Sequence, residues 1–238
     1  LHFVASVEAG HRVRQLGEAT KRVHVVGDPG LDALRQMTLM RRDELEADLG
    51  FAFLAQNFLI TFHPATRDLV PSSDQFSALL AALDKRDEVG LIFTKPNADP
   101  DGRALIAILK KFVERRSNAV VFASLGHRRY LSVMNEVDVV VGNSSSGLLE
   151  APSLEKPAVN IGGRQGGRLR APSVIDCAPE SQAINAALDK AIGMDCRGIK
   201  NPYGDGHTVA QVMQILRNLD DPQALIHKKF VDLSFDET

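Results

Sequence analysis

Residues suited to binding a negatively charged group are concentrated between positions 137 and 168, in the segment VDVVVGNSSSGLLEAPSLEKPAVNIGGRQGGR. An apolar run ends there in Gly-Asn and is followed by three serines, of which the first two are Ser144 and Ser145. Serine hydroxyls and the N–H groups at the start of a helix can donate hydrogen bonds to an anion. One strand later, Arg164 lies in a glycine-rich loop, and its guanidinium offers a fixed fork of donors that suits a diphosphate. The spacing therefore predicts a phosphate-binding loop.

Each of these residues also has a plain structural explanation. A single serine at this position could simply cap the helix, whereas three in a row beside an arginine loop favour an anion. Arg164, Arg168 and Arg170 could form a solvated cluster of charges. Glu150, about a turn and a half into the helix, could accept two hydrogen bonds from a ribose diol or could interact with the helix dipole. The spacing leaves both explanations of Glu150 open.

Two other strand ends carry polar residues, in the segments HPATRD and PNADPDGR. His63 precedes a proline that holds it in a rigid loop, and it is a candidate for catalysis, although a lone histidine is more often structural. Asn97 and Asp99 flank a turn, and turn chemistry accounts for both of them without a function. The sequence has no Walker A motif, no Gly-x-Gly-x-x-Gly motif and no metal-ligand cluster, so we expect neither a metal nor a cofactor.

These residues follow short apolar strands that alternate with helical patterns along the chain. The strands are near-continuous runs of Val, Ile and Phe, which is typical of strands covered on both faces. They are predicted at 1–6, 22–27, 57–62, 90–95, 118–123, 137–142, 157–162 and 173–177. Helices are predicted at 8–17, 31–48, 74–86, 102–116, 127–135, 145–155, 180–193 and 206–218. The alternation predicts an α/β fold with a Rossmann-like, doubly wound parallel sheet, in which ligands lie outside the carboxyl ends of the strands.

Glycine and proline in the segment GDPGLDAL, residues 27–34, mark a hinge between two domains. Because Leu1 lies inside an apolar strand, we expect residues 1–28 to be the remnant of an N-terminal domain that is largely missing from this chain. Residues 29–200 are predicted to form a complete second domain. Residues 201–238 are predicted to form a turn and a helix that cross back toward the first domain.

The composition is that of an ordinary globular protein, with 238 residues of which 44% are hydrophobic. A formal net charge of -2 gives no sign of binding to nucleic acid or to an anionic membrane. No apolar run approaches the roughly 18 residues that a membrane span needs. The two cysteines, Cys177 and Cys196, lack metal-ligand spacing, so we expect reduced thiols and a cytoplasmic location.

Several motifs together give the chain a resemblance to a known family. The segment GNSSSGLLEAPSLEKPAVNIGGRQGGR, with FHPATRD, KPNADPDGR, RRYLSVMNEVDVVVGN, NPYGDG and KKFVDL, resembles the hydrolysing UDP-N-acetylglucosamine 2-epimerases of sialic-acid synthesis. The match runs from Leu1 to the tail. The motifs SSSG and GRQGGR distinguish it from the non-hydrolysing epimerases, which typically have Ser-Gly-Gly at this position. The resemblance implies a GT-B architecture, of which this chain would carry the C-terminal, UDP-binding half.

The resemblance also implies how a UDP-sugar substrate would be bound. The backbone beside Leu125 would recognise uracil, and the ring of Tyr130 would lie close by. Glu150 would hold the ribose. Ser144 and Ser145 would bind the diphosphate.

Three further roles follow from the same resemblance. Arg164 would support the diphosphate site, while His63 and Asn97 would face the sugar and the leaving group. The family eliminates UDP across C1–C2 to give a glycal and then adds water, which releases N-acetylmannosamine. The proton-transfer carboxylates of the family lie in its N-terminal domain, so we expect the isolated chain to be inactive.

Other functions remain open at this point. A non-hydrolysing epimerase or a GT-B glycosyltransferase would share much of the fold, and a non-catalytic UDP-binding module would share the nucleotide site. The sugar could be N-acetylglucosamine or a diacetamido sugar. We expect the full-length protein to be a homo-oligomer.

Overall fold

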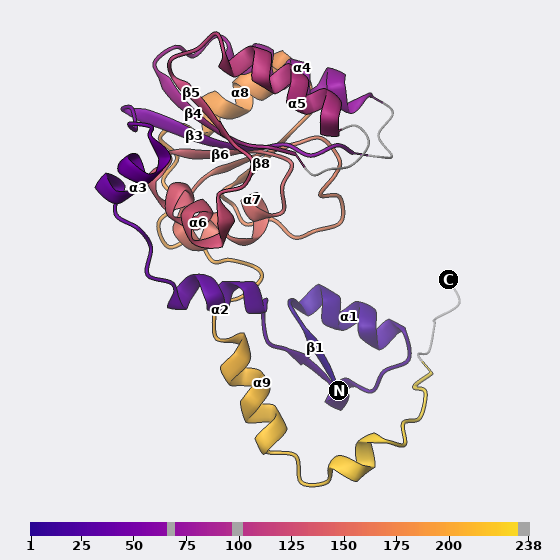
Figure 1. Ribbon diagram of the computed structural model, residues 1–238. Helices are drawn as coiled ribbons and strands as arrows, with labels where there is room; N and C mark the ends of the chain where they lie inside the picture. The colour runs from indigo at the N-terminus through magenta and orange to yellow at the C-terminus, as the bar shows by residue number, and fades with distance from the viewer. Residues whose placement is uncertain (66–69, 97–101, 233–238) are drawn as a thin grey trace. The chain divides into compact units, whose positions relative to one another are not determined.

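The computed structural model describes residues 1–65, 70–96 and 102–232 of the chain (Figure 1). These residues form two compact units, which are described separately. One unit is Thr38–Lys200, and the other combines Leu1–Met37 with the residues from Asn201 onward.

The unit Thr38–Lys200 contains a six-stranded sheet in which every neighbouring pair of strands is parallel. Its strands are β3 (Gln56–Thr61), β4 (Val89–Thr94), β5 (Ala119–Phe122), β6 (Val139–Gly142), β7 (Ala158–Ile161) and β8 (Val174–Cys177). Their order across the sheet is β5-β4-β3-β6-β7-β8. The chain thus starts at the centre, winds to one edge, and returns to wind to the other edge. This is the doubly wound order of the Rossmann fold, with its switch point between β3 and β6.

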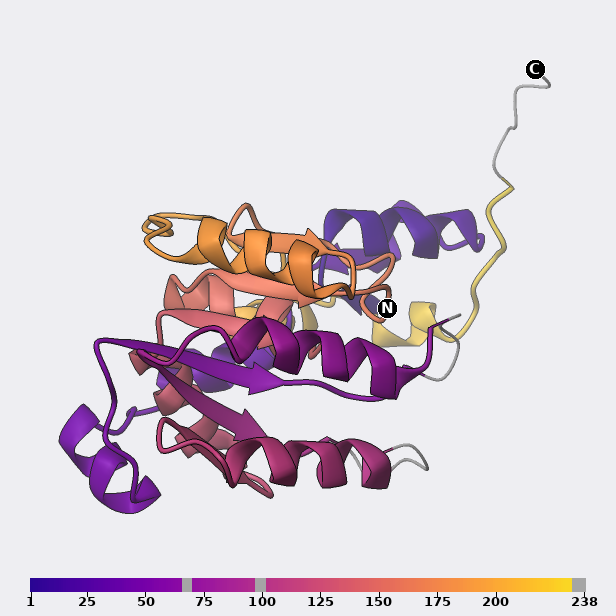
Figure 2. The same cartoon turned by 90° about the horizontal axis from the view of Figure 1, so that it is seen from above.

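Helices cover both faces of this sheet (Figure 1). Helices α4 (Ser72–Leu83), α5 (Gly102–Val113) and α8 (Ser181–Ala191) lie side by side across one face, as Figure 2 shows. Helices α3 (Arg42–Leu49), α6 (Gly126–Glu136) and α7 (Ser146–Leu149) lie on the other. Successive strand residues point to opposite faces, so Phe58 and Ile60 join the core under α4, while Leu59 joins the core under α3 and α6. All three side chains are fully buried, which explains why the strands have no polar face.

The predicted sheet and strands are confirmed, whereas two predicted helices are wrong in extent. The prediction 31–48 covers two helices, α2 (Pro29–Gln36) and α3. Between them, Met40 N–H donates to the Ser132 hydroxyl (2.9 Å), and the Thr38 carbonyl accepts from Arg128 (2.9 Å). These long-range hydrogen bonds keep the segment out of a helix. The prediction 145–155 covers α7 and a 3₁₀ helix, Ala151–Leu154, because Pro152 has no N–H with which to continue an α-helix.

The other unit is built around two parallel strands, β1 (His2–Val4) and β2 (Val23–Val25), joined by α1 (Val7–Gln15). The Asp32 carboxylate on α2 accepts hydrogen bonds from the Thr208 and Val209 N–H groups (2.9 and 2.8 Å) and so caps α9 (Thr208–Arg217). The chain segments before Thr38 and after Lys200 are therefore held together by a buried side chain. The units divide after Met37, later than the predicted hinge, so α2 belongs with β1 and β2. The domain assignment within a longer protein stays a prediction.

No helix in residues 1–65, 70–96 and 102–232 is both long enough and apolar enough to cross a membrane.

Gly142, at the end of β6, is the position where the sheet tolerates a side chain least. Its φ is +133°, and a Cβ there would lie 2.0 Å from the Thr61 carbonyl oxygen. We predict that Gly142→Ala lowers the free energy of unfolding by roughly 2–5 kcal/mol, the sum of backbone strain and overpacking. Gly193→Ala is the control, because its φ is +74° with open space around the added Cβ, and it should cost only about 1–2 kcal/mol. Equal losses for both variants in urea unfolding would contradict the steric explanation.

Candidate functional site

Asn143 joins the two loops that meet at the switch point of the sheet. Its side chain is buried, with Oδ1 accepting from His63 N–H (2.7 Å) and Nδ2 donating to the His63 carbonyl (2.8 Å). Its own N–H donates to the Thr61 carbonyl (3.1 Å). The loops after β3 and β6 are therefore held in one arrangement by an amide whose donor and acceptor are both used.

The loop after β7 is tied to the same residue. The Asn143 carbonyl accepts from Arg164 Nη1 (3.2 Å) and from Gln165 Nε2 (2.7 Å). The exposed guanidinium of Arg164 thus lies beside the serine loop. Arg170 differs, because it forms an ion pair with Asp176 (2.7 Å). Arg164 therefore lies nearer to a ligand at the strand ends than Arg170, whose guanidinium is used within its own loop and by Asp176.

An open pocket of ≈ 470 Å³ lies at the carboxyl ends of β3, β4, β5 and β6. Three residues that the sequence singled out line it, namely Leu125, Tyr130 and Ser144. The other lining residues are Thr61, Thr94, Lys95, Ala123, Ser124, Gly126, His127 and Ser146. None of these described lining residues is a carboxylate, and two of them can carry positive charge. The pocket therefore suits an anion better than a cation.

Hydroxyl groups form a continuous hydrogen-bonded chain along one wall of this pocket. The Tyr130 hydroxyl lies 2.6 Å from Ser146 Oγ and 3.3 Å from Thr61 Oγ1. Thr61 Oγ1 lies 2.7 Å from Thr94 Oγ1, and Ser146 Oγ donates to Ser144 Oγ at 3.1 Å. Burial raises the pKa of Tyr130, and the negative charge of Glu150 raises it further. The phenol therefore stays protonated at neutral pH and remains a donor.

The serine loop does not behave as an ordinary helix cap. Ser145 is the N-cap residue of α7, yet its side chain makes no capping hydrogen bond. The one backbone N–H that donates to Ser144 Oγ among the described hydrogen bonds is that of Ser146, and this bond is long (3.4 Å). Because α7 has four residues, its dipole is that of a single turn, and anion binding would depend mainly on hydroxyls and nearby N–H groups.

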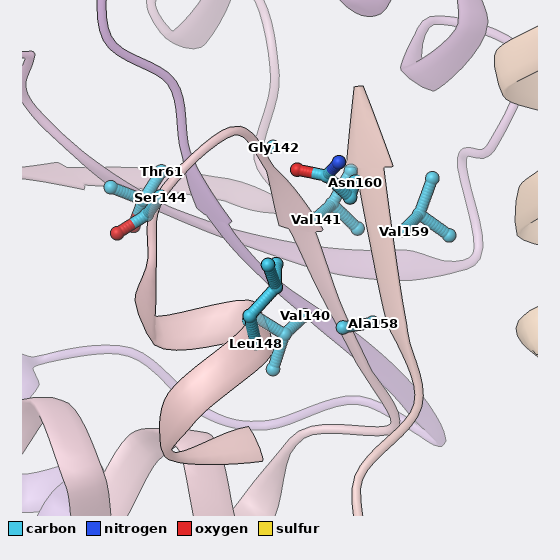
Figure 3. Close-up of a pocket in the computed structure, with 10 residues that line it drawn as sticks. Thr61, Val140, Val141, Gly142, Ser144, Leu148, Ala158, Val159 and Asn160 are labelled. Carbon is cyan, nitrogen blue, oxygen red and sulfur yellow. The ribbon is translucent and has the colours of Figure 1, made fainter. Parts of the chain in front are cut away.

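A second, much smaller cavity lies between β6, β7 and α7 (Figure 3). Its volume is ≈ 10 Å³, about that of one water molecule, and its wall is mostly apolar. Asn160 lies at its upper end, and its Nδ2 donates to Asp176 (2.6 Å). Its Oδ1 is buried and has no hydrogen-bond partner among the residues that the structure describes. This cavity is too small for a nucleotide, so the larger pocket is the candidate site.

His63 and Glu150 are not among the described residues that line the pocket. His63 is half-buried and is held at the end of β3 by Asn143. Glu150 is the C-cap residue of α7, and its charge reaches the Tyr130 hydroxyl. Asn97 lies outside the described residues, so its predicted role is not examined by the structure.

Sequence reasoning missed Thr61 and Thr94 as site residues, whereas Ser146 belongs to the run of three serines that predicted the anion loop. Thr61 and Thr94 are the last residues of their strands and are paired in register, so their hydroxyls meet. The sequence did contain an indication of their position, since each threonine lies next to the predicted end of a strand, where ligands are expected. The register between β3 and β4 could not be derived from the sequence.

A doubly wound parallel sheet with a polar pocket at its switch point defines an α/β protein of the Rossmann-like class. Residues 1–217 match the family model of UDP-N-acetylglucosamine 2-epimerase. The chain belongs to this family.

Curated relatives and solved structures agree with this assignment. The chain is 34% identical to "GDP/UDP-N,N'-diacetylbacillosamine 2-epimerase (hydrolyzing)" of Campylobacter jejuni, over 98% of this chain and 62% of the relative. It is 31% identical to "Polysialic acid biosynthesis protein P7" of Escherichia coli, over 98% of this chain and 60% of the relative. The chain thus spans less than two thirds of the length of these relatives.

The fold resembles that of UDP-GlcNAc 2-epimerase from Neisseria meningitidis bound to UDP-GlcNAc, with a TM-score of 0.68 and 16% identity over 91% of this chain and 60% of that chain. It also resembles a structure of S. aureus MnaA with UDP, with a TM-score of 0.71 and 17% identity over 98% of this chain and 62% of that chain. The predicted fold class is confirmed.

The Asn143 amide can be tested by a change that removes only its donor. Asn143→Asp would place a carboxylate against the His63 carbonyl, which is an acceptor. We predict a loss of roughly 3 kcal/mol in the free energy of unfolding, since the His63 carbonyl then loses its donor and faces a buried negative charge. The loss should shrink as the pH falls, because a protonated carboxyl can donate.

Asn185→Asp is the matched control for this change. The Asn185 Nδ2 also donates to a backbone carbonyl, that of Ser181 (2.9 Å), but its Oδ1 accepts from Arg86 (3.3 Å), so the new carboxylate would face a positive charge. It should alter stability by less than about 1 kcal/mol. Thermal and urea unfolding of both variants across pH measures the difference, and similar losses would show that the Asn143 amide has no special role.

Proposed function

We propose that this chain carries the UDP-binding part of a hydrolysing UDP-N-acetylglucosamine 2-epimerase of GT-B architecture. The observation that supports this most is the pocket at the switch point, where Leu125 and Tyr130, at the start of α6 and on it, converge with Ser144 from the serine loop. The family membership supports the same conclusion. We further propose a cytoplasmic enzyme that is a homo-oligomer in its full-length form.

In the proposed complex, the nucleotide lies across the strand ends. Uracil is bound by the backbone beside Leu125, near the Tyr130 ring, and the ribose diol by Glu150. The diphosphate lies at Ser144 and Ser145, with Arg164 beside it. The hydrogen bond from Arg164 to the Asn143 carbonyl supports this arrangement, since it brings the guanidinium close to the serine loop.

The proposed reaction begins with removal of the C2 proton and departure of UDP from C1, which leaves a glycal. Water then adds to C1 and a proton to C2, giving the epimeric free sugar. The departing diphosphate gains negative charge as the C1–O bond breaks. Oriented hydroxyls and an arginine stabilise such a charge more in the transition state than in the ground state. His63 and Asn97 are proposed to face the sugar and the leaving group.

Two sugars are candidates for the substrate. Relatives from Campylobacter jejuni and Legionella pneumophila, 34% and 28% identical, are named as N,N'-diacetylbacillosamine 2-epimerases. The relative from Neisseria meningitidis, 26% identical, is named as a UDP-N-acetylglucosamine 2-epimerase. Because the identity to the first group is higher, a UDP-diacetamido sugar is the alternative substrate to UDP-N-acetylglucosamine. Parallel assays of both substrates with the longer protein would distinguish them.

The diphosphate site can be tested by removing its two serine hydroxyls together. We predict that Ser144→Ala with Ser145→Ala weakens UDP binding by about 100-fold or more, since hydrogen bonds to a charged group contribute roughly 1.5–3 kcal/mol each. Uridine, which has no phosphate, should bind as before. Glu150→Gln should weaken both ligands, because both carry the ribose diol.

Calorimetric titrations of UDP and uridine, with thermal melts of each variant, measure these effects. Serines that only cap the helix would cost about 1 kcal/mol of stability and leave the ratio of the two affinities unchanged. An unchanged ratio in the double serine variant would therefore reject the diphosphate site.

Catalysis is expected to require groups from outside this chain. The described lining of the pocket contains no carboxylate, whereas moving a proton at C2 needs an acid and a base. We predict that this chain alone releases free sugar at least about 100-fold more slowly than the longer protein. Equal turnover by the two would place the acid and base within this chain. A longer protein that binds UDP without turnover would favour a non-catalytic binding module.

A further inference from the structure

The hydrogen bonds that Ser144 receives from Ser146 leave the Ser144 hydroxyl proton as the group that it can donate. That proton can go to Tyr130, whose hydroxyl also interacts with the Ser144 side chain, or to a ligand. Ser144 Oγ accepts from the Ser146 hydroxyl (3.1 Å) and from the Ser146 N–H (3.4 Å). A hydroxyl has two acceptor sites and one proton. With both acceptor sites used, Ser144 can offer only its proton to a ligand. Ser144 is half-buried and lines the pocket, so that proton can be directed toward a bound group.

Because each hydroxyl has one proton, the direction of the hydrogen bond between Tyr130 and Ser146 can also be assigned. Ser146 uses its single proton toward Ser144, so it must accept from Tyr130, whose hydroxyl lies 2.6 Å away. Tyr130 can in turn accept from Thr61 Oγ1 at 3.3 Å. The raised pKa of Tyr130 keeps its proton in place. Hydrogen bonds arranged in one direction polarise one another, so each strengthens the next.

We propose that Tyr130 and Ser146 are positioning residues that orient the Ser144 proton toward the diphosphate of a nucleotide. This inference rests on the proposed UDP site and assigns to Tyr130 a role for its hydroxyl that is separate from any contact of its ring. An ionised phosphate oxygen only accepts hydrogen bonds. A hydroxyl that is held as a donor before binding therefore favours phosphate over a ligand that has none.

Tyr130→Phe tests this role because it removes the hydroxyl and keeps the ring. UDP binding should weaken by about 5- to 10-fold, as expected for one net hydrogen bond acting through Ser144. Uridine binding should change by less than about twofold. Ser146→Ala should give the same pattern, and it provides a second test if Tyr130→Phe folds poorly. A loss for uridine as large as that for UDP would show that Tyr130 acts at the nucleoside, which would overturn the inference.

A double-mutant cycle distinguishes an effect of Tyr130 on UDP affinity that acts through Ser144 from an effect that is independent of Ser144. Once Ser144→Ala has removed the donor, Tyr130→Phe should cause no further loss of UDP affinity. Losses that multiply in the double variant would overturn the inference. Loss on Ser144→Ala without loss on Tyr130→Phe would also overturn it, while leaving the UDP site intact. An unchanged UDP-to-uridine ratio in Ser144→Ala would instead remove the support for the UDP site itself.

Ser132→Ala is the control for general destabilisation. Ser132 is a buried serine on α6, the helix that carries Tyr130, and its hydroxyl donates to the Arg128 carbonyl (2.7 Å) and accepts from Met40 N–H (2.9 Å). It has no contact with the hydroxyl chain among the described hydrogen bonds. It should lower the melting temperature and leave the UDP-to-uridine ratio unchanged. A ratio that falls as much as in Tyr130→Phe would mean that destabilisation, not proton orientation, is being measured.

Discussion

The arrangement of the site depends on one buried amide, that of Asn143. Two central strands of a parallel sheet end side by side, and their loops must diverge because the chain leaves them in opposite directions. Asn143 joins these loops by two hydrogen bonds to the backbone of His63, and its own carbonyl holds Arg164 and Gln165. A buried amide must be satisfied, so these bonds all favour one geometry. The three loops are thereby positioned before any ligand is bound.

The close approach of β3 and β6 has a second consequence. Gly142 lies against the Thr61 carbonyl with no room for a side chain, which lets the serine loop begin directly at the end of the sheet. Ser144 can then reach the pocket, while Ser146 turns back toward Tyr130 on α6. The hydroxyl chain is thus a product of strand packing, since it joins residues from β3, β4, α6 and the serine loop.

The wall of the pocket carries little formal charge for the anion that is proposed to bind there. Its described lining has two groups that can be cationic, Lys95 and His127, and the helix that starts beside it has a single turn. Neutral hydroxyls therefore carry more of the recognition than a long helix dipole would. Such a site suits a leaving group whose charge grows during a reaction, because oriented dipoles need not reorganise as the bond breaks.

The sequence by itself determined the class of fold and the composition of the strand ends. Continuous apolar runs that alternate with amphipathic helical runs are typical of a parallel sheet with helices on both faces. For this reason every predicted strand is present in the structure. Leu125, Tyr130 and Ser144 were likewise recognisable, through motifs. Local pattern could not predict the break before α3, because hydrogen bonds from α6 to Thr38 and Met40 decide it. Nor could it place Thr61 beside Thr94 or direct the Ser146 proton to Ser144, since strand register and side-chain hydrogen bonds exist only once distant segments have packed together.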